Sequence, residues 1–162
     1  IFFINKDYFV NILEKNNLIH SFKVKKIYPN SIEVQVKKTE LLAITNYNKK
    51  KFFIGSNGKL INFESSNKNL PYIFGKIKIE NFTNLKKIII ESKFNFEEIS
   101  ELYFFPSGRW DIKSKKGILI KLPETNLLKA LNLAHQITIN EIFNNDKVID
   151  LRIHNRVIST HE

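Results

Sequence analysis

Histidines, carboxylates and arginines are the residues of this 162-residue sequence with the most obvious capacity for chemistry. A metal site would need histidines or carboxylates at ligand spacing, and neither an HExxH pattern nor a calcium-loop pattern is present. Cysteine is absent, which excludes thiolate metal sites and disulfides. We therefore expect no metal, and surface or structural roles for the four histidines, His20, His135, His154 and His161.

The carboxylates do not fall in a pattern typical of an acid–base pair. Glu97, Glu98 and Glu101 surround the start of a strand-like run, where a solvated or helix-capping cluster is expected. Asp111 and Asp150 lie among apolar neighbours, which favours buried, paired aspartates over catalytic ones. The five glycines form no phosphate-binding loop and no nucleophile elbow. The sequence thus predicts no enzyme, no cofactor and no small-molecule substrate.

The formal net charge of +10 and the isoelectric point of about 9.7 raise the question of a nucleic-acid partner. Of the 26 basic residues, however, all but three are lysine, which lacks the planar fork that reads phosphate and guanine best. The lysines are also spread along the chain rather than gathered in one block. We expect a solvated lysine surface and no nucleic-acid partner.

Two of the three arginines, Arg152 and Arg156, lie in an alternating stretch close to the C-terminus. The runs 148–153 and 156–160 flank His154-Asn155 and predict a β-hairpin. A sheet edge left open by such a hairpin is a binding site for an added strand, because main-chain hydrogen bonds supply affinity and alternate side chains supply specificity.

The rest of the chain supplies the elements that must position this hairpin. Apolar residues at helical spacing predict a short helix ending at Asn16-Asn17 and longer helices over 81–93 and 124–143. A strand at 88–90 remains an alternative. Alternation and turn residues predict a hairpin around Tyr28-Pro29-Asn30-Ser31 and further strands at 42–46, 51–55, 59–63, 99–105, 109–113 and 118–122. Gly75 marks a bend or a close approach.

No apolar run approaches the roughly 20 residues that a membrane-spanning helix needs, and no signal peptide is visible. The sequence begins with isoleucine rather than methionine. We therefore expect a piece of a longer chain, in which a membrane anchor could precede residue 1.

Six segments resemble, in order and spacing, the FtsQ/DivIB family of bacterial cell-division proteins over residues 7–159. They are "SFKVKKIYPNSIEVQVKKTELLAI" (21–44), "FFIGSNGKLI" (52–61), "LPYIFGK" (70–76), "RWDIKSKKGILIKLPE" (109–124), "KALNLA" (129–134) and "IDLRIHNRVI" (149–158). One departure lies at Lys38-Thr39-Glu40-Leu41, where the family has a Glu-Arg-x-Pro linker.

The resemblance implies an α+β fold in two domains. Residues 1–43 would form a partial POTRA domain of helices and a β-hairpin, with its first strand missing or truncated to 1–4. Residues 44–162 would form a mixed, mainly antiparallel β domain with two flanking helices. The resemblance further implies a single-pass inner-membrane protein, with this region in the periplasm at the division septum. It would be a non-enzymatic scaffold that binds FtsB and FtsL and helps to regulate septal peptidoglycan synthesis.

In that family FtsB adds a strand to the last strand of the β domain, and the arginine of an Asp-Leu-Arg motif pairs with an acidic residue of the partner. By position this motif is Asp150-Leu151-Arg152. The resemblance thus assigns partner-binding roles to Arg152, Ile153, Arg156, Val157, Ile158, Ser159 and Thr160. Two alternatives stay open: Arg152 and Asp150 balance each other's charge, and Arg156 discourages aggregation at an exposed edge.

The same motifs assign structural roles to four further residues, Tyr28, Pro29, Trp110 and Asp111. For Trp110 we favour a core anchor over an interface role. The alternative function is that of a POTRA-bearing protein of outer-membrane assembly or two-partner secretion. Tandem POTRA units and barrel strands, expected of those proteins, are not visible in the sequence.

Overall fold

The computed structural model describes residues 6–62, 69–139, 147–153 and 156–160. These residues form a two-stranded sheet, a nine-stranded sheet and three α-helices, so the predicted α+β class is confirmed. Predicted features at 1–4, 63–68 and 140–146, together with His154, Asn155 and His161, lie outside the described residues.

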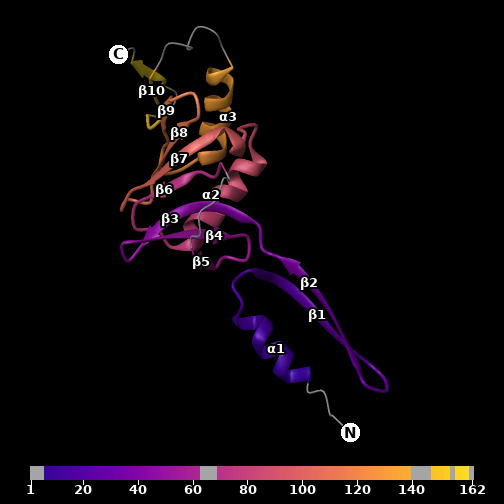
Figure 1. Ribbon diagram of the computed structural model, residues 1–162. Helices are drawn as coiled ribbons and strands as arrows, with labels where there is room; N and C mark the ends of the chain where they lie inside the picture. Colours follow the sequence, from indigo (N-terminus) through magenta and orange to yellow (C-terminus); the bar gives the residue numbers. More distant parts are fainter. Residues whose placement is uncertain (1–5, 63–68, 140–146, 154–155, 161–162) are drawn as a thin grey trace.

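The N-terminal unit consists of a helix and a ribbon of two antiparallel strands. Helix α1 (Lys6–Lys15) precedes β1 (Ile19–Ile27) and β2 (Ser31–Lys38). The strands pair from Ile19↔Lys38 to Ile27↔Ser31, and the Tyr28–Pro29 peptide at the turn is cis. Figure 1 shows this ribbon projecting from the rest of the molecule, with α1 alongside it. The predicted helix and hairpin are both present.

The nine described strands of the large sheet follow the order β11-β10-β9-β8-β7-β6-β3-β4-β5. The pairs β3–β6, β6–β7 and β9–β10 are parallel and the other five are antiparallel, so the sheet is mixed and mainly antiparallel, as expected. The strands are β3 (Leu41–Tyr47), β4 (Lys50–Gly55), β5 (Leu60–Asn62), β6 (Tyr72–Phe74), β7 (Ile99–Phe104), β8 (Trp110–Ser114), β9 (Leu119–Lys121), β10 (Val148–Asp150) and β11 (Ile158–Thr160).

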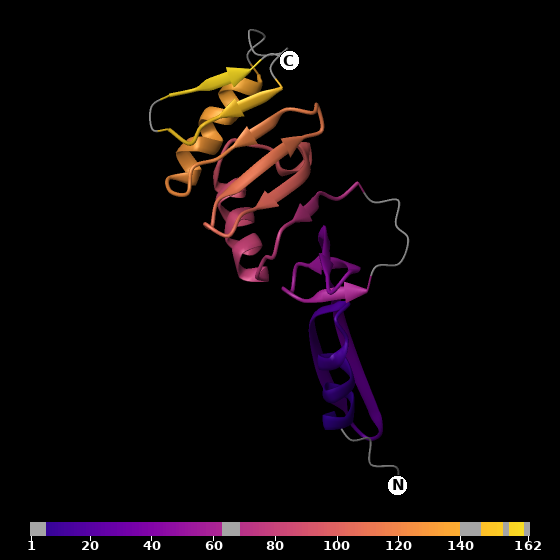
Figure 2. The ribbon, with the colours of Figure 1, turned by 90° about the vertical axis from the view of Figure 1, so that its left-hand side faces the viewer.

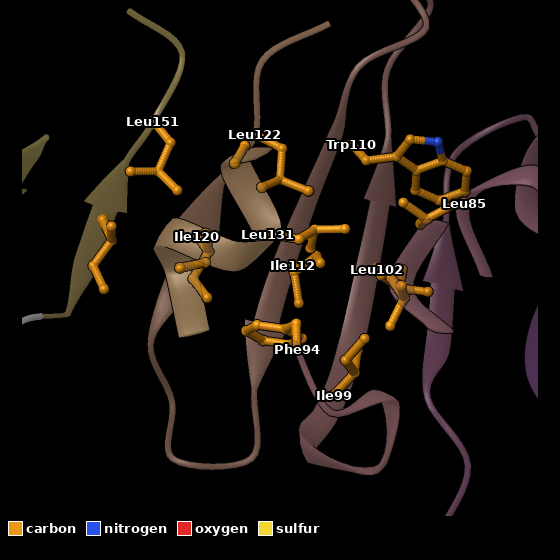
Figure 3. Close-up of a cluster of buried hydrophobic side chains, with 14 of the residues drawn as sticks. Leu85, Phe94, Ile99, Leu102, Trp110, Ile112, Ile120, Leu122, Leu131 and Leu151 are labelled. Atoms are coloured by element: carbon orange, nitrogen blue, oxygen red, sulfur yellow. The ribbon is translucent and has the colours of Figure 1, made fainter. Parts of the chain in front are cut away.

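Two helices cover one face of this sheet. Helix α2 (Ile79–Glu91) connects the parallel strands β6 and β7, and α3 (Leu127–Thr138) connects β9 and β10, because a parallel pair requires a crossover. Figure 3 shows Leu85 of α2 and Leu131 of α3 against side chains of the central strands. The central row of the sheet in this core is Ile73, Leu102, Ile112, Ile120 and Ile149.

The helical prediction for 81–93 is confirmed, and the alternative strand at 88–90 is wrong. Phe82, Leu85 and Ile89 are the buried residues of α2, and they recur at the spacing of one helical face. The helix begins at Ile79, two residues earlier than predicted. Gly75, just before it, has φ +106°, and a Cβ there would lie 2.3 Å from the Phe104 carbonyl oxygen. The predicted close approach is therefore present.

The turn between β4 and β5 joins the large sheet to the N-terminal unit. The Asn57 side-chain amide donates to the backbone oxygens of Asn17 at 2.9 Å and Ile19 at 3.0 Å. The Asn17 side-chain amide in turn donates to the Leu60 carbonyl at 2.9 Å. Strand β3 belongs to the large sheet from Leu41 onward, so the proposed boundary at 43/44 falls within that strand.

Candidate functional site at the sheet edge

Strand β11 lies at one end of the nine-stranded order, and β5 lies at the other. One side of β11 pairs with β10 through Val148↔Thr160, Ile149↔Ser159 and Asp150↔Ile158. Among the described residues no strand pairs with its other side. Figure 2 shows the two yellow strands at this end of the molecule, far from the N-terminal unit. The outer side of β11 is thus an open main-chain edge.

The hairpin strands are shorter than the predicted runs 148–153 and 156–160. The Asp150 carboxylate accepts a hydrogen bond from the Arg152 backbone N–H at 3.0 Å, an arrangement that turns the chain out of the extended conformation. The Arg156 N–H donates to the Ile153 carbonyl at 3.2 Å, a bond that does not belong to the ladder between the two strands. Strand β10 therefore ends at Asp150, and β11 begins only at Ile158.

The side chains of β11 divide between the two faces of the sheet. Ser159 is half-buried and lies opposite Ile149, so it belongs to the face that the helices cover. Ile158 and Thr160 are exposed on the other face. Val157, just before the strand, is also exposed. An added strand would meet Ile158 and Thr160 as its neighbours on the uncovered face.

Arg152 forms a charge pair with Asp150 inside the same chain. Its Nε donates to the two carboxylate oxygens at 2.8 and 2.9 Å, and its Nη2 donates to Oδ2. These hydrogen bonds hold the pKa of Asp150 below its usual value, against the opposing effect of burial. The carboxylate contacts one side of the guanidinium, and among the described residues Nη1 has no hydrogen-bond acceptor, so that side of the fork can donate to a second acceptor.

The Arg152–Asp150 pair lies at the end of a row of residues with alternating charge that crosses strands β8, β9 and β10. Cα pairing places Asp111 opposite Lys121, and Lys121 beside Asp150, all on the uncovered face. Arg109 Nε lies 3.3 Å from a carboxylate oxygen of Asp111. Burial raises the pKa of Asp111, while the charges of Arg109, Lys121 and Arg152 act in the opposite direction. Asp111 is therefore a buried, paired aspartate within this row.

A small pocket of about 140 Å³ opens beside the hairpin, between it and the start of α3. Arg152 and Arg156 line it together with Lys129, and Leu151 and Ile153 provide apolar wall. The N-terminus of α3 adds its positive dipole end. Three cations around an apolar pocket favour an acidic and partly apolar ligand.

The remaining predicted residues lie elsewhere. Trp110 is 3% exposed and packs on Phe104 with ring centroids 4.7 Å apart, so it is part of the core (Figure 3). Tyr28 and Pro29 form the tip of the ribbon. Across the described part of the chain, no group of histidines, aspartates and glutamates is placed to hold a metal ion. None of the described helices has the length and apolar character to span a membrane.

Sequence reasoning missed the part of the pocket that comes from α3. Lys129 and Asn126 are 23 residues or more from Arg152 in sequence and carry no motif that links them to it. The parallel β9–β10 crossover brings them together. The sequence did contain one indication of this site: Lys129 lies in the first turn of α3, where a positive charge is unfavourable beside the helix dipole.

Comparison with known proteins gives a consistent family match. Residues 43–152 match the sequence model of the family described as "Cell division protein FtsQ/DivIB, C-terminal". The chain is 30% identical to "Cell division protein FtsQ" of Rickettsia bellii over 96% of this chain and 60% of that relative. It is 25% identical to the protein of the same name from Rhizobium radiobacter, over 85% of this chain and 68% of the relative.

The chain therefore spans about three fifths of the length of the Rickettsia bellii relative. Among solved structures it is similar to the major extracytoplasmic domain of the cell-division protein DivIB from Geobacillus stearothermophilus, in its trans isomer. That similarity has a TM-score of 0.43 and 13% identity, and it covers 59% of this chain and 87% of the other.

Proposed function

This chain belongs to the FtsQ/DivIB family of bacterial cell-division proteins, and from that premise we propose that it is a non-enzymatic scaffold of the division machinery. Its described region would lie in the periplasm, tethered to the inner membrane by a segment upstream of residue 1. Its partners would be FtsB- and FtsL-like division proteins, and through them it would help to regulate septal peptidoglycan synthesis. The proposed partner-binding site is the C-terminal edge of the large sheet.

The observation that carries this proposal is the open outer side of β11 among the described residues. A partner strand on that side would extend the sheet and satisfy main-chain groups that β10 does not reach. The exposed Ile158 and Thr160 would contact alternate side chains of the added strand. The nearby pocket would receive a partner side chain that follows or precedes the strand.

Arg152 supports the proposal through the side of its guanidinium that faces away from Asp150. The Asp150 hydrogen bonds fix the orientation of the fork before any partner arrives. A partner carboxylate would then bind to an ordered donor, with Arg156 and Lys129 adding positive potential at the pocket. In this proposal the internal charge pair and the partner contact are compatible, because they use different N–H groups of Arg152.

The test of the carboxylate contact is calorimetric titration with a peptide from the periplasmic segment of the FtsB-like protein of the same organism. We expect Arg152→Glu to weaken binding at least about tenfold, since it places like charges together. The matched control is Lys50→Glu, which makes the same charge change at the exposed start of β4, near the opposite edge. The control should stay within about twofold of the wild type. Unchanged affinity of Arg152→Glu would remove Arg152 from the site.

Strand addition is tested separately by proline at two neighbouring positions, Ile158→Pro and Ser159→Pro. Successive backbone N–H groups of a strand point to opposite sides, so one variant removes a bond to β10 and the other removes a donor on the open side. We expect one variant to lose peptide binding while it keeps the wild-type unfolding midpoint. Full peptide binding by both variants would exclude addition at β11.

A further inference from the structure

The ribbon of β1 and β2 has a second surface feature, independent of the sheet edge. It pairs only within itself among the described residues and ends in the turn Tyr28-Pro29-Asn30. Figures 1 and 2 show its tip at the opposite end of the elongated molecule from β11. The tip is therefore far from the proposed partner-binding site, and its properties need a separate explanation.

The tip exposes apolar surface. The side chain of Tyr28 is 80% exposed, the highest value among the large exposed hydrophobic residues of the described chain, and Ile27 beside it is 43% exposed. The Lys26 ammonium lies 5.3 Å from the centre of the Tyr28 ring. A tyrosine with a cation against its ring and water on most of its surface buries little of its apolar area in this fold.

The ribbon around this tip is strongly basic. Its strands carry five exposed lysines and one acidic residue, Glu33. The Glu33 carboxylate accepts a hydrogen bond from Gln35 at 2.9 Å and faces Lys25 across the ribbon. The ribbon thus carries an excess of four positive charges; Lys25 and Lys26 lie next to the apolar tip, whereas Lys37 and Lys38 pair with Ser21 and Ile19 at the other end. The five lysines are Lys23, Lys25, Lys26, Lys37 and Lys38.

We propose that the tip of this ribbon binds the surface of an anionic phospholipid bilayer, with Ile27 and Tyr28 at the headgroup boundary and Lys25 and Lys26 against lipid phosphates. Tyrosine and lysine suit this boundary, because their apolar parts can meet hydrocarbon while the hydroxyl and the ammonium stay in water, and the apolar Ile27 adds contact with the hydrocarbon. Each lysine near an anionic surface raises the partition coefficient roughly fivefold. A nucleic acid fits less well, since the ribbon contains no arginine.

The β8–β9 turn provides a natural comparison within the same chain. It carries the exposed pair Lys115 and Lys116, but the next hydrophobic residue, Ile118, is buried. The β3–β4 turn exposes Tyr47 together with Lys49, Lys50 and Lys51, but among the described residues it has no second exposed apolar side chain beside the tyrosine comparable to Ile27. The β8–β9 turn thus has positive charge without an exposed aromatic ring, whereas the β3–β4 turn is a rival site of the same composition that the experiment must separate from the ribbon tip.

The test is cosedimentation of the 162-residue chain with vesicles of phosphatidylcholine alone and of phosphatidylcholine with phosphatidylglycerol, at an ionic strength of about 0.15 M. We expect binding to the anionic vesicles, a loss of at least about tenfold in Lys25→Glu/Lys26→Glu and a smaller loss in Tyr28→Ala. The charge control Lys115→Glu/Lys116→Glu and the variant at the rival site, Tyr47→Ala, should both stay within about twofold of the wild type. Equal binding to both vesicle types, or equal losses in tip and control variants, would overturn the proposal.

Fluorescence locates the contact directly. Trp110 is 3% exposed in the core, so it is shielded from lipid, and Tyr28→Trp would introduce an accessible reporter at the tip. Brominated anionic lipids should quench Tyr28→Trp and leave the same substitution at the other turn, Tyr47→Trp, unquenched. Failure to quench Tyr28→Trp in vesicle-bound protein would show that the tip is not the contact. An acidic-protein or nucleic-acid site at the tip would give the same negative result with vesicles and would also refute the proposal.

Discussion

Replacing Ile149 by alanine should destabilise the end of the sheet that carries the open edge. Ile149 is fully buried in the centre of β10, with Ile120 as its neighbour on β9. Strand β10 spans only three residues, so side-chain burial rather than a long hydrogen-bonded ladder must hold it in place. Each buried carbon removed costs about 0.8 kcal/mol, and the cavity left behind adds to this. We expect a loss of about 3 kcal/mol in the free energy of unfolding.

Urea unfolding followed by Trp110 fluorescence measures this loss, because Trp110 lies in the same core as Ile149. The matched control is Ile153→Ala, the same substitution at a half-exposed position three residues after the strand. It should cost less than about 1 kcal/mol, since most of that side chain already contacts water. A loss below about 1 kcal/mol for Ile149→Ala, equal to that of Ile153→Ala, would mean that burial does not anchor the hairpin.

Four further perturbations have outcomes fixed by local geometry. Gly75→Ala should lower the free energy of unfolding by more than about 2 kcal/mol, because its Cβ would meet the Phe104 carbonyl. Gly117→Ala, at φ +89° but in open space, should lower it by only about 1 kcal/mol. Equal shifts of the melting temperature in the two variants would refute this. Asn57→Ala should broaden the distance distribution between spin labels at Gln35 and Lys116, and Asn62→Ala should not. The hydrogen bond to Glu101, aided by burial, raises the pKa of Tyr103 to about 12. The stabilisation from this hydrogen bond is therefore fully present below the ordinary tyrosine pKa and is lost as pH rises through about 12. Tyr103→Phe should accordingly remove the tyrosinate absorbance change that occurs at the highest pH in an ultraviolet titration. The pKa of Asp150 is lowered, so its pair with Arg152 contributes above the ordinary aspartate pKa and is lost as pH falls below it; Arg152→Ala should move the NMR-detected pKa of Asp150 back toward its usual value.

Local pattern predicted much of the fold because the signals were short-range. The spacing of Phe82, Leu85 and Ile89 identified the face of α2 that is buried. The turn residues Ser56-Asn57-Gly58 identified the β4–β5 connection, and Gly75 its close approach to a neighbouring strand. In each case one residue type or one period decides the conformation, so no distant contact is needed.

Other features depended on contacts that no local pattern contains. The order of the strands, with three parallel pairs, follows from crossovers whose end points are set by the packing of α2 and α3. The short β10 follows from the Asp150 carboxylate bonding to the Arg152 backbone, a competitor of the ladder that β-propensity ignores. The Arg152–Asp150 pair, one of the two alternatives left open by the sequence, is present; whether Arg152 also binds a partner stays a prediction.

Hydrogen exchange at the backbone amides of residues 158–160 tests the central claim most directly. With saturating FtsB-like peptide, an amide of β11 that points away from β10 should exchange much more slowly, while the amides of 60–62 at the opposite edge keep their free rates. Unchanged exchange throughout 158–160 in the peptide-bound protein would contradict strand addition at this edge.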